Sequence, residues 1–308
     1  MPRNRPHFLC IGAQKAATSW LAHNLRQHPE VWMPPIKEIH YFDRVEGRVP
    51  AGQQGARGGL AQRRLASHLF PRGTRPSLRA WRTVRLMRAH PVWAARFLLG
   101  RWTDRWYRSL FPRRAGLVTG EATPAYARLD AEGVAHVARV APSARVIYML
   151  RDPVERAWSG ARMNARKRFG REIAEEPAAE QIAFLADGAD GLHRRFRRHS
   201  EYVANLGRWE RRYASGRVHL AYFDDVVAEP ARVLRSVYRF LGVSDDAAHV
   251  PSAVRRPVNR RAAPAAMPAE TGRWLTEQLL GEVEACHARF QNEHTAGWVN
   301  AAERRLAA

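Results

Sequence analysis

A lysine and two hydroxyl residues lie in a short turn between an apolar run and a helix-forming segment. The stretch IGAQKAATS, residues 11–19, follows the apolar residues 8–10 and leads into residues 20–25. A strand that ends in such a turn places backbone N–H groups and the positive end of a helix at one point. Because Lys15 adds a mobile cation there, the stretch indicates a phosphate site. By itself it is equally consistent with an ordinary turn that carries a surface lysine.

The turn differs from the phosphate loop of ATP- and GTP-binding proteins. The pattern G-x-x-x-x-G-K-[ST] is absent, because Lys15 comes three residues after Gly12 and no Gly-Lys-Ser/Thr follows. Arg151, rather than an acidic Mg²⁺ ligand, follows the apolar run RVIYML. A nucleotide-dependent kinase of the P-loop type is therefore a disfavoured alternative. We expect no metal ion, since the sequence has no convincing cluster of His, Cys and Asp ligands.

A second candidate phosphate site is the stretch RDPVERAWS, which begins at Arg151. Arg151 follows a predicted buried strand, at the edge where ligands bind in parallel sheets. Ser159 lies one to two turns into the next helix, where Pro153 suits the first helical position. An arginine and a hydroxyl so placed can grip a phosphate. The alternative is that Arg151 pairs with Asp152 or Glu155 and that Ser159 is merely a small helix residue.

The elements that must position these residues alternate between strands and helices. Short apolar, β-branched runs predict strands at residues 8–11, 31–33, 116–126, 145–150 and 218–223. Amphipathic segments predict helices at about residues 18–27, 131–141, 153–166, 174–186, 200–214 and 230–241, and a last helix at 270–290. Such alternation implies an α/β fold with a mainly parallel central sheet and helices on both faces. We expect one domain over residues 1–308, with a basic, Trp/Arg-rich insertion at about 44–114.

The composition predicts attraction to polyanions. The 308 residues include 51 Lys+Arg against 29 Asp+Glu, a formal charge of +22. This charge fits nucleotides, nucleic acid, anionic glycans or anionic lipid surfaces. A basic nucleic-acid-binding protein is an alternative that rests on charge alone, with no reading helix or stacking motif to support it. The leading interpretation therefore includes no nucleic-acid partner.

The sequence also indicates the cellular compartment of the protein. Two cysteines in a chain of this length do not make a disulfide framework. No apolar run approaches the roughly 18–20 residues that span a bilayer, and the N-terminal apolar stretch is too short for a signal peptide. We therefore expect a cytoplasmic protein.

Arginine and aromatic residues interleave in the insertion. We interpret residues 76–114 as a helical insertion packed on the domain, with its tryptophans in the core rather than on a stacking platform: Trp81, Trp93, Trp102 and Trp106. Contact of this segment with a membrane surface, or a lid over an anionic acceptor, are the alternatives.

Four stretches, in this order, resemble segments of the sulfotransferases that use 3′-phosphoadenosine 5′-phosphosulfate (PAPS). IGAQKAATS resembles their 5′-phosphosulfate loop, and RDPVERAWS resembles their 3′-phosphate motif. IKEIHYFD (residues 36–43) and GEATPAY (residues 120–126) resemble segments of the branch that includes heparan sulfate sulfotransferases and many bacterial proteins. The resemblance extends from Phe8 to about Trp298. It implies a three-layer, P-loop-like α/β fold and the transfer of a sulfuryl group from PAPS to a hydroxyl or amine of a carbohydrate, glycolipid or small-molecule acceptor.

The resemblance also implies residue roles. Lys15 would stabilise the leaving phosphate, Glu38 would be the catalytic base, and His40 is the second candidate base. The implied PAPS-binding residues are Gln14, Lys15, Ala16, Ala17, Thr18, Ser19, Arg151, Ser159, Asn259, Arg260 and Arg261. The implied acceptor-binding residues are Lys37, Glu38, His40 and Asp43. Without the resemblance, Glu38 reads as a surface glutamate paired with Lys37, His40 as a packed histidine and Asp43 as a turn cap.

Two positions depart from the family pattern. Ala17 replaces the glycine usual in the first loop, and alanine tolerates a positive φ poorly. Either the loop needs no such conformation there or the affinity for PAPS suffers. Ala122 replaces a lysine found in heparan-acting members, which weakens a heparan assignment. The sequence predicts neither the acceptor nor the oligomeric state.

Overall fold

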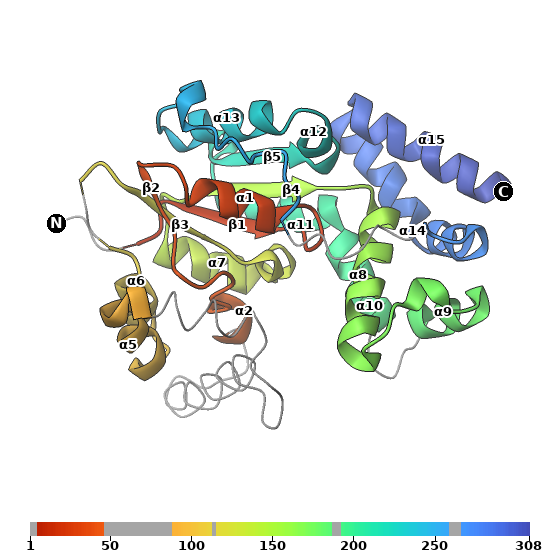
Figure 1. The fold of residues 1–308 in the computed structure, drawn as a ribbon, viewed down its shortest axis with the longest axis horizontal. Helices are drawn as coiled ribbons and strands as arrows, with labels where there is room; N and C mark the ends of the chain where they lie inside the picture. Colours follow the sequence, from red (N-terminus) through yellow and green to blue (C-terminus); the bar gives the residue numbers. More distant parts are fainter. Residues whose placement is uncertain (1–4, 46–87, 113–114, 187–191, 259–265) are drawn as a thin grey trace.

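Five parallel strands form the centre of the molecule (Figure 1). The computed structural model describes residues 5–45, 88–112, 115–186, 192–258 and 266–308. The strands are β1 (Phe8–Gly12), β2 (Val31–Trp32), β3 (Val118–Ala122), β4 (Arg145–Leu150) and β5 (Val218–Tyr222). Their order is β2-β3-β1-β4-β5, and each neighbouring pair is parallel. The predicted α/β fold with a parallel sheet is confirmed.

Helices cover the sheet on both faces, with α12 and α13 on one side and α7 on the other (Figure 1). The helices are α1 (Thr18–Leu25), α2 (Phe42–Val45), α5 (Pro91–Leu99), α6 (Asp104–Ser109), α7 (Ala131–Val140), α8 (Pro153–Phe169), α9 (Ala178–Ala186), α10 (Leu192–Ser200), α11 (Tyr202–Glu210), α12 (Phe223–Ala228), α13 (Pro230–Leu241), α14 (Ala269–Phe290) and α15 (Glu293–Ala307). Short 3-10 turns lie at Pro124–Arg128, Ile173–Glu175, Ser215–Arg217 and Ala247–His249. Among the described helices, none is both long and apolar enough to cross a membrane.

Three helix predictions were incomplete. The segment 270–290 is not the last helix, because α15 follows α14 after the cap residue Asn292. The helix predicted at 200–214 corresponds to α11, which ends earlier at Glu210, and α10, which ends at Ser200, was not predicted. The helix α12 was not predicted, because it begins directly where β5 ends.

The central strands β1 and β4 supply the middle of the core. Every residue of β1 is buried, and β4 is buried except for its first residue. Fully buried parallel strands read as unbroken apolar runs, which explains why FLCIG and RVIYML were recognisable. The tryptophans of the described part of the insertion are also core residues, since Trp93, Trp102 and Trp106 are all buried. Trp81 lies within residues 46–87 of the insertion, which are outside the described residues.

Local signals fix the start and end of α8. The Asp152 carboxylate accepts hydrogen bonds from the N–H groups of Val154 at 2.8 Å and Glu155 at 3.4 Å, and Pro153 occupies the first turn. These are ordinary features of a helix N-terminus. The helix ends at Gly170, whose φ of 73° suits glycine. This arrangement holds Arg151 at the carboxyl end of β4.

Candidate active site

The two candidate phosphate stretches meet at one edge of the sheet. The chain turns from β1 towards β2 on one side and from β4 towards β5 on the other, so β1 and β4 flank a topological switch point. Ligands bind at such a point, outside the carboxyl ends of the strands. The N–H of Ala13 donates to Met149 O at 2.7 Å, and Arg151 Nη1 donates to Lys15 O at 3.3 Å. The loop after β1 and the loop after β4 are therefore joined directly.

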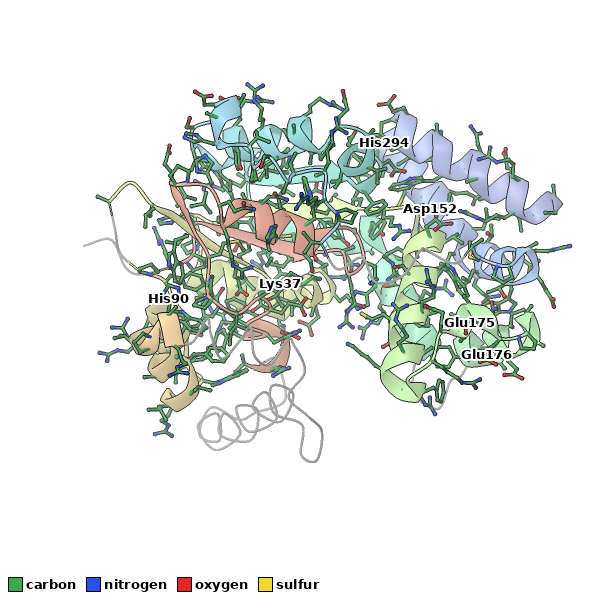
Figure 2. The ribbon with its side chains drawn as sticks, viewed as in Figure 1. Lys37, His90, Asp152, Glu175, Glu176 and His294 are labelled. Carbon is green, nitrogen blue, oxygen red and sulfur yellow. The ribbon has the colours of Figure 1, made fainter. Side chains whose placement is uncertain are left out.

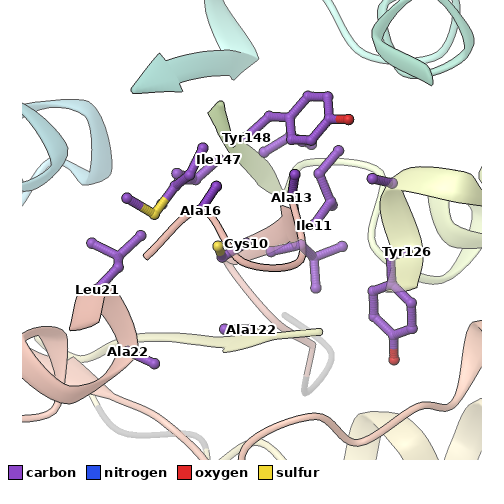
Figure 3. Close-up of a cluster of buried hydrophobic side chains, with 14 of the residues drawn as sticks. Cys10, Ile11, Ala13, Ala16, Leu21, Ala22, Ala122, Tyr126, Ile147 and Tyr148 are labelled. Carbon is purple, nitrogen blue, oxygen red and sulfur yellow. The ribbon is translucent and has the colours of Figure 1, made fainter. Parts of the chain in front are cut away.

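The floor beneath these loops is apolar and tightly packed. Figure 3 shows Cys10, Ile11 and Ala13 together with Ile147 and Tyr148 of β4. A Cβ on Gly12 would lie 3.0 Å from Ala127 Cβ and 3.1 Å from the ring of Tyr148, which accounts for the glycine at this position.

Lys15 stands in a field of positive charge. Burial, and after it the charges of Arg166, Arg151, Arg162 and Lys167, together lower its pKa from 10.5 to about 8. Cations that repel one another in this way form a site that an anion stabilises. A polyanionic nucleotide therefore fits the residues present at this edge of the sheet.

The other residues of the first loop differ in what they can offer. Thr18 is buried and Ser19 half-buried at the start of α1, while Gln14 is half-buried in the turn before it. The side chain of Ala16 is buried in the core, and its N–H donates to Ala13 O at 3.2 Å. Ala16 therefore contributes to the shape of the loop rather than to a polar contact. Ala17 is the N-cap residue of α1, with φ 62° and ψ 15°.

Arg151 is held by contacts on three sides. Its Nη2 lies 3.3 Å from Glu155 Oε2, its Nη1 contacts Lys15 O, and its guanidinium carbon lies 4.4 Å from the ring centre of Phe223. Asp152, the other acidic partner considered from the sequence, pairs with Arg305 instead. Ser159 is half-buried on α8. The contact of Arg151 with Glu155 is a long one, so it leaves the guanidinium able to bind a further anion.

The segment before α2 brings a carboxylate, an imidazole and a second lysine to the first loop. Lys37 Nζ donates to Glu38 Oε1 at 2.7 Å and to Thr18 Oγ1 at 3.3 Å. Figure 2 shows Lys37 close to α1, as this contact requires. His40 lies between two carboxylates, with Nε2 3.3 Å from Glu38 Oε2 and Nδ1 2.8 Å from Asp43 Oδ2.

Both segments carry backbone strain at the candidate residues. Positive φ values occur at Lys15 (75°), Ala17 (62°), Glu38 (67°) and His40 (57°). In the part of the chain that the structure describes, Gln291 is the one further non-glycine residue with a positive φ. Non-glycine residues in this region cost free energy, and they persist where the surroundings hold them in place, often at functional sites. This clustering of backbone strain therefore distinguishes these two segments from the rest of the described chain, as expected of a functional site.

The chain belongs to a known family. A sequence model described as the sulfotransferase family matches residues 6–247. This chain is a member of the sulfotransferase family. The match covers both candidate phosphate stretches and the segment of Lys37, Glu38 and His40, and it favours sulfuryl transfer over the kinase alternative.

Relatives of this sulfotransferase agree with the assignment. Heparan sulfate glucosamine 3-O-sulfotransferases 3B1 and 3A1 of Mus musculus are each 30% identical to it over 141 residues, 45% of this chain and 35% and 34% of theirs. The chain therefore matches about a third of the length of these curated relatives. A solved sulfotransferase structure from Alicyclobacillus acidocaldarius is 23% identical, with a TM-score of 0.56 over 96% of this chain and 98% of that one. This likeness shows the shared fold.

The electrostatics of the candidate site give Glu38 and His40 different protonation states. Burial raises the pKa of Glu38, but the hydrogen bond from His40 and the charge of Lys37 reverse this and hold the pKa well below its usual range. Burial lowers the pKa of His40, but its bonds to Asp43 and Glu38 raise it to about 9 overall. At neutral pH Glu38 is thus a carboxylate and His40 an imidazolium.

The structure adds Glu121, the glutamate of GEATPAY, to the candidate site, although the sequence pattern predicted no role for it. Glu121 on β3 is 1% exposed. It accepts hydrogen bonds from the hydroxyls of Tyr107 at 2.6 Å, Thr123 at 2.7 Å and Tyr126 at 3.1 Å, and from the Ile39 N–H at 3.4 Å. Because Ile39 lies between Glu38 and His40, this bond from the Ile39 N–H to Glu121 holds the backbone of the strained segment against β3.

A further anchor acts on the same segment. Tyr126 accepts from the N–H of Tyr41 at 3.0 Å while it donates to Glu121. Ala122 also takes part through its backbone, since Ala122 O accepts from the N–H of Glu38 at 3.2 Å. Position 122 therefore lies directly beside the candidate base.

The predicted basic loop of Asn259, Arg260 and Arg261 lies outside the described residues. Within the described ranges, no group of three or more His, Cys, Asp or Glu side chains is placed to hold a metal ion.

Proposed function

We propose that this sulfotransferase transfers the sulfuryl group of PAPS to a hydroxyl or amine of a carbohydrate, glycolipid or small-molecule acceptor, with 3′-phosphoadenosine 5′-phosphate (PAP) as the product. The observation that carries the proposal is the joining of Lys15 and Arg151 at one switch point, where burial and the neighbouring cations lower the pKa of Lys15 to about 8. PAPS supplies an activated sulfuryl group on a phosphate leaving group, in chemistry akin to phosphoryl transfer.

Lys15, Thr18 and the start of α1 would hold the 5′-phosphate. A leaving phosphate gains negative charge, and fixed cations and N–H donors stabilise that charge most where water is excluded. Lys15 is well suited because it is partly buried and has no carboxylate among the groups that shift its pKa. Arg151 and Ser159 would bind the 3′-phosphate, which separates PAPS from ATP and fixes the far end of the nucleotide.

Glu38 is the proposed base. His40, the second candidate, has a pKa of about 9 and is protonated at neutral pH, so its imidazole has no free nitrogen to accept a proton from the acceptor. Glu38 is ionised there, and its side chain is 39% exposed, so an acceptor hydroxyl can reach it. A carboxylate with a low pKa is a weak base. Lys37 contacts both Glu38 and Thr18, so movement of its cation towards an anion at Thr18 would raise the pKa of Glu38.

The residue at position 122 argues against heparan sulfate as the acceptor. Ala122 stands beside Glu38, where heparan-acting members of the family carry a lysine. This supports an acceptor other than heparan sulfate and leaves carbohydrates, glycolipids and small molecules as the proposed class.

Contact with a membrane surface through residues 76–114 is also proposed, on the basis of α5. This helix exposes Val92 at 64% and Leu99 at 82%, with Arg96 exposed between them. An exposed apolar stripe beside arginines is typical of helices that lie on anionic lipid. Leu99→Asp should abolish salt-sensitive pelleting with anionic vesicles, and a wild-type protein that stays in solution would contradict the contact.

The experiment that tests the activity is a comparison of melting temperatures with PAP, AMP and ATP–Mg²⁺, in moderate salt that screens charge-driven binding. We expect PAP to raise the melting temperature most, and Arg151→Ala to remove the difference between PAP and AMP. A shift with ATP–Mg²⁺ alone would support a kinase, and no shift with any nucleotide would refute the proposal.

A further inference from the structure

We propose that Arg305, on the C-terminal helix α15, is a positioning residue for the 3′-phosphate site, because it occupies the two carboxylates that would otherwise neutralise Arg151. The inference rests on the proposed function, which assigns Arg151 to the 3′-phosphate. Arg305 lies beyond residues 6–247, so the family match gives it no role.

Arg305 binds both carboxylates of the motif that begins with Arg151. Its Nη1 and Nη2 lie 3.0 Å and 3.1 Å from Asp152 Oδ2, and Nη2 also lies 3.1 Å from Glu155 Oε1. Figure 2 labels Asp152 at the end of α8 nearest the C-terminal helices. The side chains of Arg305 and Asp152 are only 19% and 8% exposed, so this pair is poorly screened by water.

The two oxygens of each carboxylate have separate tasks. Asp152 uses Oδ1 to cap α8, through Val154 and Glu155, and Oδ2 to bind Arg305. Glu155 offers Oε1 to Arg305 and Oε2 to Arg151, the latter at 3.3 Å. Arg305 and Arg151 therefore share the Glu155 carboxylate, and Arg305 makes the shorter contact.

The presence of Arg305 decides how much net positive charge the Arg151 site offers to a phosphate. With Arg305 in place, the four groups Arg151, Asp152, Glu155 and Arg305 are neutral together, and Arg151 keeps a long contact that a phosphate can displace. Without Arg305 the group carries one negative charge, which repels a phosphate, and Glu155 is free to close on Arg151. A change of one unit charge beside an anion-binding site changes the affinity for the anion by about tenfold.

The helix α15 does not depend on Arg305 for its place. Asn292 Nδ2 donates to the Tyr222 hydroxyl at 2.7 Å, and His294 Nε2 lies 3.0 Å from Asp225 Oδ2. The buried ring of Trp298 lies 5.9 Å from that of Tyr222. An Arg305 variant should therefore keep the helix docked.

The test measures nucleotide binding by calorimetry rather than turnover. In Arg305→Gln we expect the Kd for PAP to rise about tenfold, with the Kd for AMP, which lacks the 3′-phosphate, unchanged. Arg304→Gln is the matched control, because Arg304 is the exposed neighbour on the same helix and should leave both constants unchanged. Arg305→Lys should lie between the wild type and Arg305→Gln.

A second variant distinguishes charge from structure. Glu155→Gln added to Arg305→Gln removes the excess negative charge and should restore most of the affinity for PAP. Equal weakening of PAP and AMP binding, or no rescue by Glu155→Gln, would overturn the inference and leave Arg305 a structural residue. If the wild type binds PAP no better than AMP, the proposed function fails instead, so the two failures are distinct.

Discussion

The imidazole Nε2 of His40 lies 3.3 Å from Oε2 of Glu38, and both residues have a positive φ. The other ring nitrogen, Nδ1, lies 2.8 Å from Asp43 Oδ2. The strained backbone thus turns the side chains of residues 38 and 40 directly towards each other. The contact keeps a proton on His40 and a charge on Glu38, which gives the two residues different chemical roles.

Replacement of Glu38 tests its role as the base. Glu38→Gln should lower kcat by about 10²–10⁴-fold, the usual contribution of a positioned base, with the affinity for PAP nearly unchanged. Steady-state kinetics and PAP calorimetry on the same preparation give both values. Parallel losses of kcat and of affinity would make Glu38 a structural residue.

The ion pair predicts how stability depends on pH. The pKa of His40 is raised from 6.5 to about 9, so its stabilisation is complete below about pH 6.5 and is lost as the pH rises through about 9. Glu38 acts in the opposite sense, because its lowered pKa gives stabilisation that is lost only in acid. Melting temperatures between pH 6 and 10 should fall in the wild type and change less in His40→Gln. Identical slopes would refute the charged state of His40.

Local patterns predicted the elements, but long-range contacts required the structure. The strands FLCIG and RVIYML and the turns that follow them carry their own signals, so both phosphate stretches could be placed on strand ends. The strand order could not, since it depends on Phe8 pairing with both Gly120 and Arg145. The same holds for the contact of Lys37 with Thr18, which joins the two segments of the site.

The helix α15 shows why other parts escaped prediction. Its buried face consists of Thr295, Trp298 and Ala302, of which only the tryptophan is a large apolar residue. The hydrophobic period is therefore weak, and the signal that remains is the capping box of Asn292 with Thr295. Without this helix in view, Arg305 could not be connected with Asp152. Glu121 was missed for a related reason, because the donors that surround it come from four separate positions.

The pKa of Lys15 predicts that nucleotide binding depends on pH. In the free protein Lys15 loses its proton at about pH 8, whereas a bound polyanion favours the cation. The affinity for PAP should change little between about pH 7 and pH 8, where the phosphates are fully ionised and Lys15 keeps its proton. Above that pH, binding must take up a proton, so the affinity should fall by up to about tenfold per pH unit. Calorimetry in buffers of different ionisation enthalpy measures the proton directly. Lys15→Arg, which stays charged, should show no proton uptake over this range.

Glu121 should position the segment of Glu38 without touching PAPS. Glu121→Gln keeps the shape but turns one acceptor oxygen into a donor. The hydroxyls around it can rotate, whereas the Ile39 N–H cannot. An unsatisfied buried group costs about 1–3 kcal/mol, so we expect a lower free energy of unfolding and a lower kcat with an unchanged Kd for PAP. Thr123→Val removes one donor and keeps the carboxylate, so it serves as the milder control.

The protonation state of Glu121 gives that prediction a clear contrary outcome. Burial raises the pKa of Glu121, and its hydrogen bonds from Thr123, Tyr107 and Tyr126 oppose the rise. If the folded protein held Glu121 protonated, a glutamine would replace it with little loss of stability or of kcat. Equal unfolding curves for Glu121→Gln and the wild type would therefore show that the carboxylate is neutral.

Ala17 gives the sharpest test of the strained first loop. Its φ of 62° shows that the loop adopts the left-handed conformation that glycine occupies freely, so the alanine is strained rather than accommodated by a different loop. The left-handed region costs a residue with a Cβ about 1–2 kcal/mol, and a glycine loses about 0.4–1 kcal/mol more through the unfolded chain. Ala17→Gly should therefore raise the free energy of unfolding by up to about 1 kcal/mol, measured by denaturant titration. Ala95→Gly, in the exposed middle of α5, is the matched control and should lower it by about 1 kcal/mol. Two changes of the same sign would contradict the left-handed conformation at Ala17.

The same variant also tests nucleotide binding, because the start of α1 carries the proposed 5′-phosphate contacts. Ala17→Gly should bind PAP at least as tightly as the wild type. Weaker binding would mean that the strain at Ala17 helps to shape the phosphate site.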